Sequence, residues 1–205
     1  LCAEGRCMDE ALLVGLDERL KAASAPAAKA GTQLLVLHQL GNHGPSYFRR
    51  FPPAFKRFTP QCEHDDLRKC STEEIVNAYD NALLYTDHVL ARLIKQLQAA
   101  QGQVDSVVLY VSDHGESLGE NNLFLHGLPY AIAPRFQTEV PMVMWLSDGL
   151  RDSLGVDAAC LKQRTSEPAS HDHLFHTLLA LLDVQTSLYD STLDLTGGCR
   201  PPAAR

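Results

Sequence analysis

Short apolar runs alternate with amphipathic segments along this chain. Residues 33–38 read Gln-Leu-Leu-Val-Leu-His, and similar runs occur at 105–111 and 140–146. Nearly continuous apolar runs of this length are typical of strands buried on both faces, as in a parallel sheet. We therefore predict three strands at these positions.

Three other segments carry apolar residues at helical spacing. The first runs from Met8 to about Ala23, and the last from Ser170 to Asp183. The clearest extends from Ser71 to about Ala100, with Glu74 three residues after Ser71, which is the pattern of a capping box. We predict a helix in each segment.

The order of these elements indicates the fold class. Strand, helix, strand, loop, strand and helix predict an α/β architecture with a mainly parallel sheet flanked by helices. Residues 22–31 read as an alanine-rich connector, and 41–60 as a long irregular loop rich in glycine, proline and aromatic residues. A length of 205 residues fits one domain.

Composition and charge narrow the classes of function. Hydrophobic residues make up 45% of the chain, charged residues 21%, and the formal net charge is −7. Lys and Arg are spread along the chain, so the basic stripe of a nucleic-acid-binding protein is missing. No run reaches the roughly 20 apolar residues of a membrane span. Because the first residue is Leu1, we expect a segment of a longer protein.

The cysteine spacing favours disulfides. Cys2 and Cys7 are close neighbours, and Cys62 and Cys70 bracket a polar loop. Short polar loops closed by cysteines are typical of oxidising compartments. The alternative is six unrelated thiols, and neither pair has the spacing of a zinc knuckle. Two further cysteines have no assigned partner: Cys160 and Cys199.

Candidate chemistry follows two of the predicted strands. His43-Gly44 lies after the first strand, and Asp113-His114-Gly115 and later His126-Gly127 lie after the second. Ligands of α/β sheets gather beyond the carboxyl ends of strands, so we expect these loops to face one site. A carboxylate and an imidazole suit zinc, although a bare Asp-His pair can also cap a helix.

The segment from Tyr110 to Ala131 closely resembles the lipid A phosphoethanolamine transferases, a family that includes the mobile colistin-resistance enzymes. Its distinctive part reads Ser-Asp-His-Gly-Glu-Ser-Leu-Gly-Glu-Asn, followed by Leu-His-Gly-Leu-Pro-Tyr-Ala. Further matches lie at 37–45, 79–81, 141–147 and 173–179, so that the resemblance covers most of the chain. It implies an alkaline phosphatase/sulfatase-like fold and a disulfide between Cys62 and Cys70.

The resemblance also implies a reaction. Phosphoethanolamine would pass from phosphatidylethanolamine to lipid A in a zinc-dependent transfer, through a covalent intermediate on a threonine. Position by position, the resemblance implies that Asp113 and His114 are zinc ligands. His43 and His126 would contact the phosphoryl group or a second zinc, with His43 donating a proton to the leaving alcohol. Glu116 would contact the substrate or a second metal.

One departure from the family pattern concerns its nucleophile. The family places a threonine, a glutamate ligand and a membrane domain before these motifs, and nothing before Gly31 matches them. We therefore interpret residues 1–205 as the C-terminal portion of a single periplasmic catalytic domain, incomplete at its N-terminal side and inactive alone. We expect it at the periplasmic face of the bacterial inner membrane, with phosphatidylethanolamine as donor, lipid A or a related lipopolysaccharide as acceptor, and no nucleic-acid partner.

Two alternatives stay open. A sulfatase-like hydrolase or phosphoglycerol transferase would share the fold, and a silent fragment would bind zinc without turnover. The other histidines favour structural roles: His38 as a core or supporting residue, His64 and His88 as structural or solvated, and the group His171, His173 and His176 as packing residues. Four basic residues of the aromatic loop could meet anionic lipid phosphates: Arg49, Arg50, Lys56 and Arg57.

Overall fold

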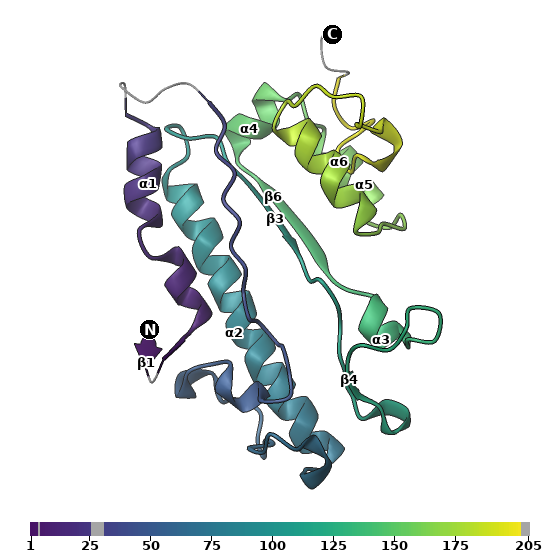
Figure 1. Ribbon diagram of the computed structural model, residues 1–205. Coiled ribbons are helices and arrows are strands. Elements are labelled where there is room, and N and C mark those ends of the chain that lie inside the picture. Colours follow the sequence, from purple (N-terminus) through teal and green to yellow (C-terminus); the bar gives the residue numbers. More distant parts are fainter. Residues whose placement is uncertain (4, 26–30, 202–205) are drawn as a thin grey trace.

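The computed structural model describes residues 1–3, 5–25 and 31–201. Its helices and strands form three layers (Figure 1). The N-terminal helix α1 and the long helix α2 lie on one side, the strand pair β3 and β6 in the middle, and the C-terminal helices on the other side. This arrangement confirms the α/β class.

The regular elements have the following bounds. The helices are α1 (Leu16–Ala23), α2 (Thr72–Ala99), α3 (Arg135–Thr138), α4 (Asp148–Ser153), α5 (Ala158–Arg164) and α6 (Asp172–Leu181). The strands are β1 (Cys2–Ala3), β2 (Arg6–Cys7), β3 (Val107–Val111), β4 (Ser117–Leu118), β5 (Phe124–Leu125) and β6 (Met142–Leu146). Short 3₁₀ turns η1 to η6 occupy Asp9–Leu13, Tyr47–Arg49, Pro53–Phe55, Leu67–Lys69, Glu120–Asn122 and Ser191–Leu193.

Helix α2 is the centre of the packed core. It begins with the predicted capping box, in which the Ser71 side chain accepts from the Glu74 N–H and the Glu74 side chain accepts from the Ser71 N–H. Its buried face carries Ala82, Tyr85 and Val89, which pack with Leu13 and Phe51, and a second cluster around Ile75 and Tyr47. The prediction of this helix is confirmed, and so is that of α6.

The segment from Met8 to Ala23 does not form the single continuous helix that the sequence predicted. It divides into η1 and α1 around Gly15, whose φ is +79°, a left-handed conformation that glycine adopts readily. The break directs Leu13 into the core of α2, while Leu16 is the buried residue of α1. Part of the predicted connector, residues 26–30, lies outside the described residues.

The predicted strand at 33–38 is also wrong. Residues 31–40 form no strand, and most of their apolar side chains are exposed to solvent, with Leu34 57% and Val36 81% exposed. A strand needs a neighbour to receive its backbone hydrogen bonds, and the described part of the chain supplies none here. Leu37 alone of this run packs against the core of α2.

The strands β3 and β6 form at the predicted places but pair antiparallel. Val107 lies opposite Leu146, and Val111 opposite Met142. Parallel pairing requires a long crossover, usually a helix, that returns the chain to the same end of the sheet. Here residues 112–141 instead form loops with the short strands β4 and β5 and helix α3 beside the end of β3, so the chain re-enters in the opposite direction (Figure 1). The predicted parallel arrangement is therefore wrong for this pair.

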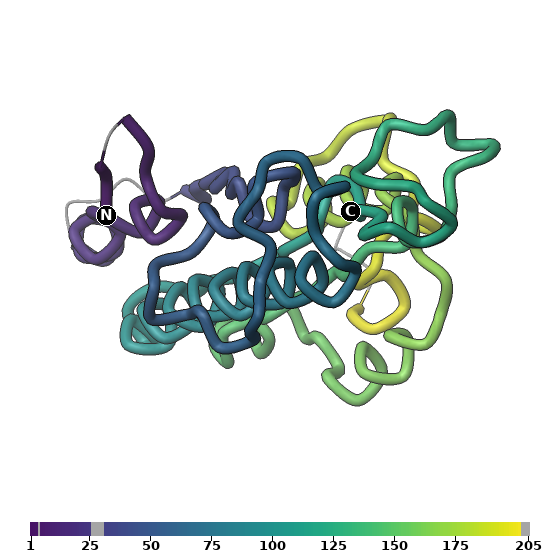
Figure 2. The backbone as a smooth tube through the Cα atoms, turned by 90° about the horizontal axis from the view of Figure 1, so that it is seen from below, coloured from purple at the N-terminus to yellow at the C-terminus, as the bar shows by residue number. Residues whose placement is uncertain are grey.

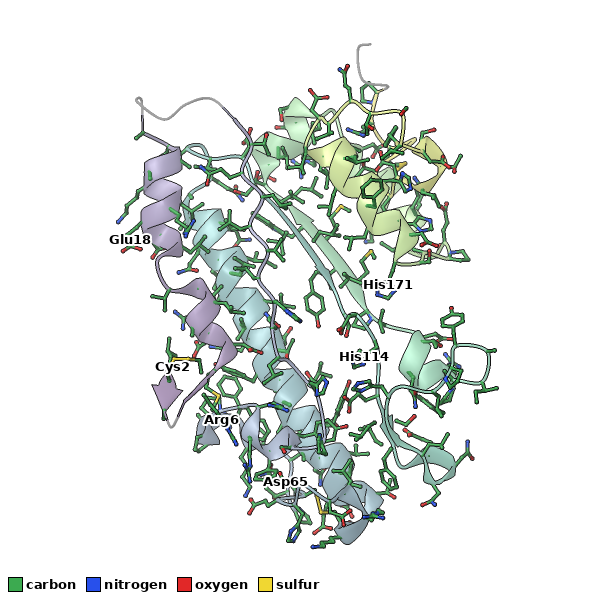
Figure 3. All side chains as sticks on the ribbon, in the orientation of Figure 1. Cys2, Arg6, Glu18, Asp65, His114 and His171 are labelled. Atoms are coloured by element: carbon green, nitrogen blue, oxygen red, sulfur yellow. A yellow bond between two sulfur atoms is a disulfide. The ribbon has the colours of Figure 1, made fainter. Side chains whose placement is uncertain are left out.

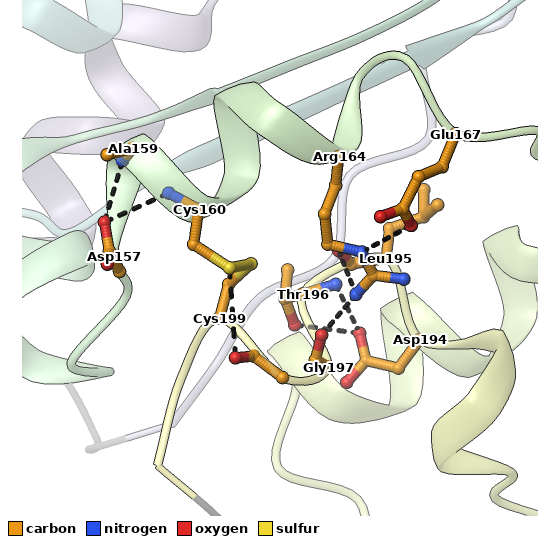
Figure 4. Close-up of a disulfide and its surroundings, with 11 residues drawn as sticks. Asp157, Ala159, Cys160, Arg164, Glu167, Asp194, Leu195, Thr196, Gly197 and Cys199 are labelled. Carbon is orange, nitrogen blue, oxygen red and sulfur yellow. Dashed lines mark hydrogen bonds and ion pairs between the residues drawn. A yellow bond between two sulfur atoms is a disulfide. The ribbon is translucent and has the colours of Figure 1, made fainter.

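Disulfides close three segments. Cys2–Cys7 and Cys62–Cys70 confirm the two predicted pairs. The third bond, Cys160–Cys199, joins α5 to the C-terminal segment. Next to it, Arg164 donates to the carbonyl oxygens of Leu195 and Gly197 (Figure 4). No helix in the described residues is long and apolar enough to cross a bilayer.

Candidate active site

Three histidines from separate loops lie together where β3 ends. His43 comes from the loop before η2, His114 follows β3, and His126 follows β5. Their ring centroids are 3.8 Å apart for His114 and His126, 5.0 Å for His43 and His126, and 5.8 Å for His43 and His114. One ligand atom from each ring lies within 4.8 Å of the other two. The histidine cluster is thus compact enough for one ion or one phosphoryl group.

The hydrogen bonds of the three rings indicate which nitrogen is free. Nδ1 lies 2.7 Å from the Gly44 carbonyl oxygen in His43, 2.9 Å from the Gly115 carbonyl oxygen in His114, and 3.2 Å from Glu116 Oε1 in His126. Carbonyl and carboxylate oxygens accept, so each Nδ1 carries the hydrogen. Each neutral ring then keeps a lone pair on Nε2. An acceptor behind each ring is the usual arrangement of metal-binding histidines.

The buried carboxylate of Glu116 connects the loop that bears His43 with the loop that bears His126. Glu116 is 8% exposed and accepts three hydrogen bonds, which we call the Glu116 network. The donors are the Gly44 N–H at 2.9 Å, the Tyr47 hydroxyl and His126 Nδ1 at 3.2 Å. Burial, and then the bond to Glu116, raise the pKa of Tyr47, so that its hydroxyl stays protonated and donates. The network fixes the His43 loop against the His126 loop.

Gly44 is needed for this close approach. A Cβ at this position would lie 2.5 Å from Leu125 Cδ2 and 2.7 Å from both Glu116 Oε2 and the Tyr47 hydroxyl oxygen. Real Cβ atoms do not approach other atoms so closely. The glycine beside His43 therefore lets the backbone N–H reach the carboxylate.

Asp113 occupies the open side of the site. Its side chain is 80% exposed, and its Oδ2 lies 3.9 Å from His114 Nε2. Its Oδ1 accepts from the His114 N–H at 3.0 Å. The carboxylate is therefore next to His114, although it does not belong to the histidine cluster.

The sequence gave no sign of a contact from His171, the residue that precedes α6. His171 Nε2 lies 2.8 Å from the Ser112 carbonyl oxygen, so the imidazole donates to the residue before Asp113. Figure 3 shows His171 above His114, at the N-terminal end of α6. The two residues are 59 positions apart, and no local pattern links them. His171 holds the end of β3 in place.

The other histidines lie apart from this cluster. His173 Nδ1 accepts from the Ser170 N–H and His176 Nδ1 from the Asp190 N–H, as expected for packing residues. His64 is exposed and His88 contacts Glu10. His38 is exposed, so its interpretation as a core residue is wrong.

Comparisons with known proteins identify the family of this chain. The sulfatase family matches residues 1–184. The phosphoethanolamine transferase EptA of Salmonella typhimurium is 44% identical over 200 residues, which are 97% of this chain and 36% of that protein. The phosphatidylethanolamine transferase Mcr-1 of Escherichia coli is 44% identical over 179 residues, which are 87% of this chain and 30% of that protein. The chain thus spans about a third of the length of these curated relatives.

Solved structures match over nearly the whole chain. The soluble domain of lipooligosaccharide phosphoethanolamine transferase A from Neisseria meningitidis superposes with a TM-score of 0.89 at 44% identity, covering 98% of this chain and 59% of that one. The periplasmic domain of EcEptC from Escherichia coli, solved in complex with zinc, gives a TM-score of 0.77 at 26% identity, covering 99% and 54%. This chain belongs to the sulfatase family and, within it, is similar to the phosphoethanolamine transferases.

Proposed function

We propose that this chain forms part of the active site of a zinc-dependent phosphoethanolamine transferase at the periplasmic face of the bacterial inner membrane. The donor is phosphatidylethanolamine and the acceptor lipid A. The observation that carries the proposal is the histidine cluster, with every Nδ1 bound to an acceptor and every Nε2 lone pair left available. The similarity to named phosphoethanolamine transferases supports the substrate class.

The residues present fit zinc. Imidazole nitrogen and carboxylate oxygen are common zinc ligands, and each imidazole here has an acceptor on its other nitrogen. We assign Asp113 and His114 as ligands, with His43 and His126 on the phosphoryl side of the same site. When bound, zinc would neutralise phosphoryl charge and lower the pKa of an attacking hydroxyl. The zinc complex of a related domain supports the choice of metal.

His43 is the proposed proton donor. Its Nδ1 is held by the Gly44 carbonyl oxygen, so Nε2 is the ring nitrogen that can take up a proton and pass it on. As the phosphorus–oxygen bond of the donor lipid breaks, this proton goes to the oxygen of the departing diacylglycerol. The phosphoethanolamine group passes to the oxygen of a threonine hydroxyl, which we place in the protein before the present chain and which gives up its own proton to solvent, and then to the acceptor.

Glu116 is proposed as a positioning residue. The resemblance suggested a direct contact with substrate or a second metal, but its buried carboxylate already accepts from Gly44, Tyr47 and His126. A group bonded in this way orients His126 Nε2 and keeps the His43 loop in place.

The test uses the protein as encoded, a fluorescent phosphatidylethanolamine and lipid A, with zinc added. We expect release of fluorescent diacylglycerol and lipid A heavier by one phosphoethanolamine. Because the family as a whole is named for sulfatases, hydrolysis of an aryl sulfate is measured in parallel. Sulfate release without phosphoethanolamine transfer would replace the proposal by the hydrolase alternative.

A further inference from the structure

A cavity lies beside the loop that leads to His43. It has a volume of about 750 Å³ and lies between the N-terminal disulfide hairpin, the turn at Leu40 and Gly41, and the aromatic segment from Phe48 to Pro52. Gly41 is two residues before His43, so this cavity and the histidine cluster share one loop.

Arginines from two segments line the cavity. They are Arg6 of β2, Arg49 and Arg50. Arg50 Nε donates to the His43 carbonyl oxygen at 2.7 Å, which couples the cavity to the candidate active site. Arg49 forms an ion pair of 3.4 Å with Asp65, in which both side chains are largely open to solvent. Figure 3 shows Arg6 next to the disulfide of Cys2.

The described part of the wall contains two acidic residues, Asp9 and Glu10. The two carboxylate oxygens of Asp9 accept from the backbone N–H groups of Leu40 at 3.1 Å and Gly41 at 2.8 Å. Glu10 pairs with Arg92 and with His88. Among the described residues of the wall there are three arginines, Arg6, Arg49 and Arg50, and two carboxylates, each of which has partners of its own.

The charge balance at Arg50 points the same way. Burial, followed by the positive charge of Arg6, lowers the pKa of Arg50, while Asp9, Glu116 and Tyr47 act in the opposite direction. An anion between the guanidinium groups of Arg6 and Arg50 would offset the repulsion between them. Arginine is well suited to this task because its planar fork matches phosphate oxygens.

We propose that this cavity, which is linked to the histidine cluster through the loop of Gly41 and His43, binds the phosphate group of a lipid headgroup. The apolar part of its wall, formed by Met8, Leu40, Phe48 and Phe51, suits the sugar or glycerol carbons attached to that phosphate. The source of the phosphate rests on the proposed function. It is either the phosphomonoester of a phosphorylated glucosamine acceptor or the phosphodiester of the donor lipid.

Binding is tested without turnover. Glucosamine 1-phosphate is titrated into the full-length protein and followed by its ³¹P signal, with inorganic phosphate as second probe. Saturable binding is expected in the wild type and in Arg57→Gln, an exposed arginine of the same segment outside the cavity. The double variant Arg6→Gln, Arg49→Gln should bind at least tenfold more weakly. Equal binding by all three proteins would overturn the proposal.

Kinetics then separate the two sources. If the acceptor occupies the cavity, the double variant raises the KM for lipid A about tenfold and leaves the KM for phosphatidylethanolamine unchanged. A rise in the donor KM alone assigns the cavity to the donor, and no rise in either contradicts lipid binding there. Absence of transfer in the wild type would refute the proposed function, whereas the binding experiment would still decide the cavity.

Discussion

The histidine cluster and the disulfide-closed segments are held together by different means. The loops that bear His43, His114 and His126 contain no cysteine and are joined by the Glu116 network. By contrast, the N-terminal hairpin, the loop before α2 and the C-terminal segment are each closed by a disulfide. Viewed from below, the N-terminal hairpin and the loops of residues 112–135 lie at opposite ends of the molecule (Figure 2).

The disulfides mainly affect the stability of the fold, whereas the Glu116 network affects the arrangement of the candidate site. Covalent cross-links stabilise segments with little apolar surface of their own, mainly by restricting the unfolded chain. The loops of His43 and His126 are instead held by hydrogen bonds to the buried Glu116 carboxylate. Substitutions in the two regions should therefore change different measured quantities.

The largest expected effect is on activity. Asp113→Ala and His114→Ala in the protein as encoded should each lower phosphoethanolamine transfer on the order of 10³-fold or more, because catalytic zinc usually keeps three protein ligands. Asp113 is largely exposed, so its substitution should change the free energy of unfolding by at most about 0.5 kcal/mol. The control is His64→Ala, an exposed histidine in the loop closed by Cys62–Cys70. Full activity of either site variant would refute the ligand assignment.

The largest effect on stability should come from the C-terminal cross-link. The bond Cys160–Cys199 closes 39 residues. Replacing both cysteines by serine should lower the free energy of unfolding by roughly 4 kcal/mol. Urea unfolding without reductant measures this loss, and the zinc affinity of the folded protein should stay unchanged. The matched pair Cys62→Ser, Cys70→Ser, which opens a shorter loop, should cost roughly 2–3 kcal/mol. The reverse order would contradict the loop-closure explanation.

An intermediate effect is expected within the Glu116 network. Tyr47→Phe removes one of the three donors to a buried carboxylate, which should cost about 1–3 kcal/mol of unfolding free energy. Tyr79→Phe is the control, since this ring lies edge-on to Tyr47 with centroids 5.4 Å apart. If both variants lose the same stability, the bond to Glu116 adds nothing.

The smallest effect concerns Glu10, which lies outside the site. Burial alone would raise its pKa, but hydrogen bonds from Arg92 and His88 and their charges outweigh it, so the pKa falls below the usual 4.5. A lowered pKa in the folded state means that the contribution to stability is complete above pH 4.5 and is lost as the pH falls through the folded pKa.

The unfolding midpoint of Glu10→Gln should therefore lie below that of the wild type at pH 7 and approach it near pH 3. Urea titrations at both values measure this difference. Glu18→Gln, on the exposed side of α1, is the control. A difference that persists unchanged in acid would show that the ion pairs are not its cause.

The sequence predicted those parts of the fold whose stabilising contacts are local. Helix α2 forms as expected because its capping box and apolar stripe lie within its own segment. The run at 33–38 was misjudged because a strand depends on a neighbour elsewhere in the chain. The antiparallel pairing of β3 and β6 was missed for the same reason, since apolar runs do not specify direction.

At the candidate site, too, the sequence indicated local features but not contacts between distant residues. The sequence indicated that His43, His114 and His126 approach one another, because histidine-glycine loops follow two predicted strands. It gave no sign that Glu116 is buried behind them or that His171 holds Ser112, since both contacts join distant residues. The cavity lined by Arg6, Arg49 and Arg50 likewise lies between the N-terminal hairpin and the segment after His43, which are distant in the sequence.

The most direct test of the central claim is the position of zinc in crystals of the protein grown with the metal. Diffraction recorded above and below the zinc absorption edge gives a map in which zinc alone stands out. We predict a peak within bonding distance of His114 Nε2, about 2.0–2.1 Å, with the Asp113 carboxylate or the other cluster histidines as further ligands. A peak at His171, His173 and His176, or no peak at the histidine cluster in zinc-saturated crystals, would contradict the account.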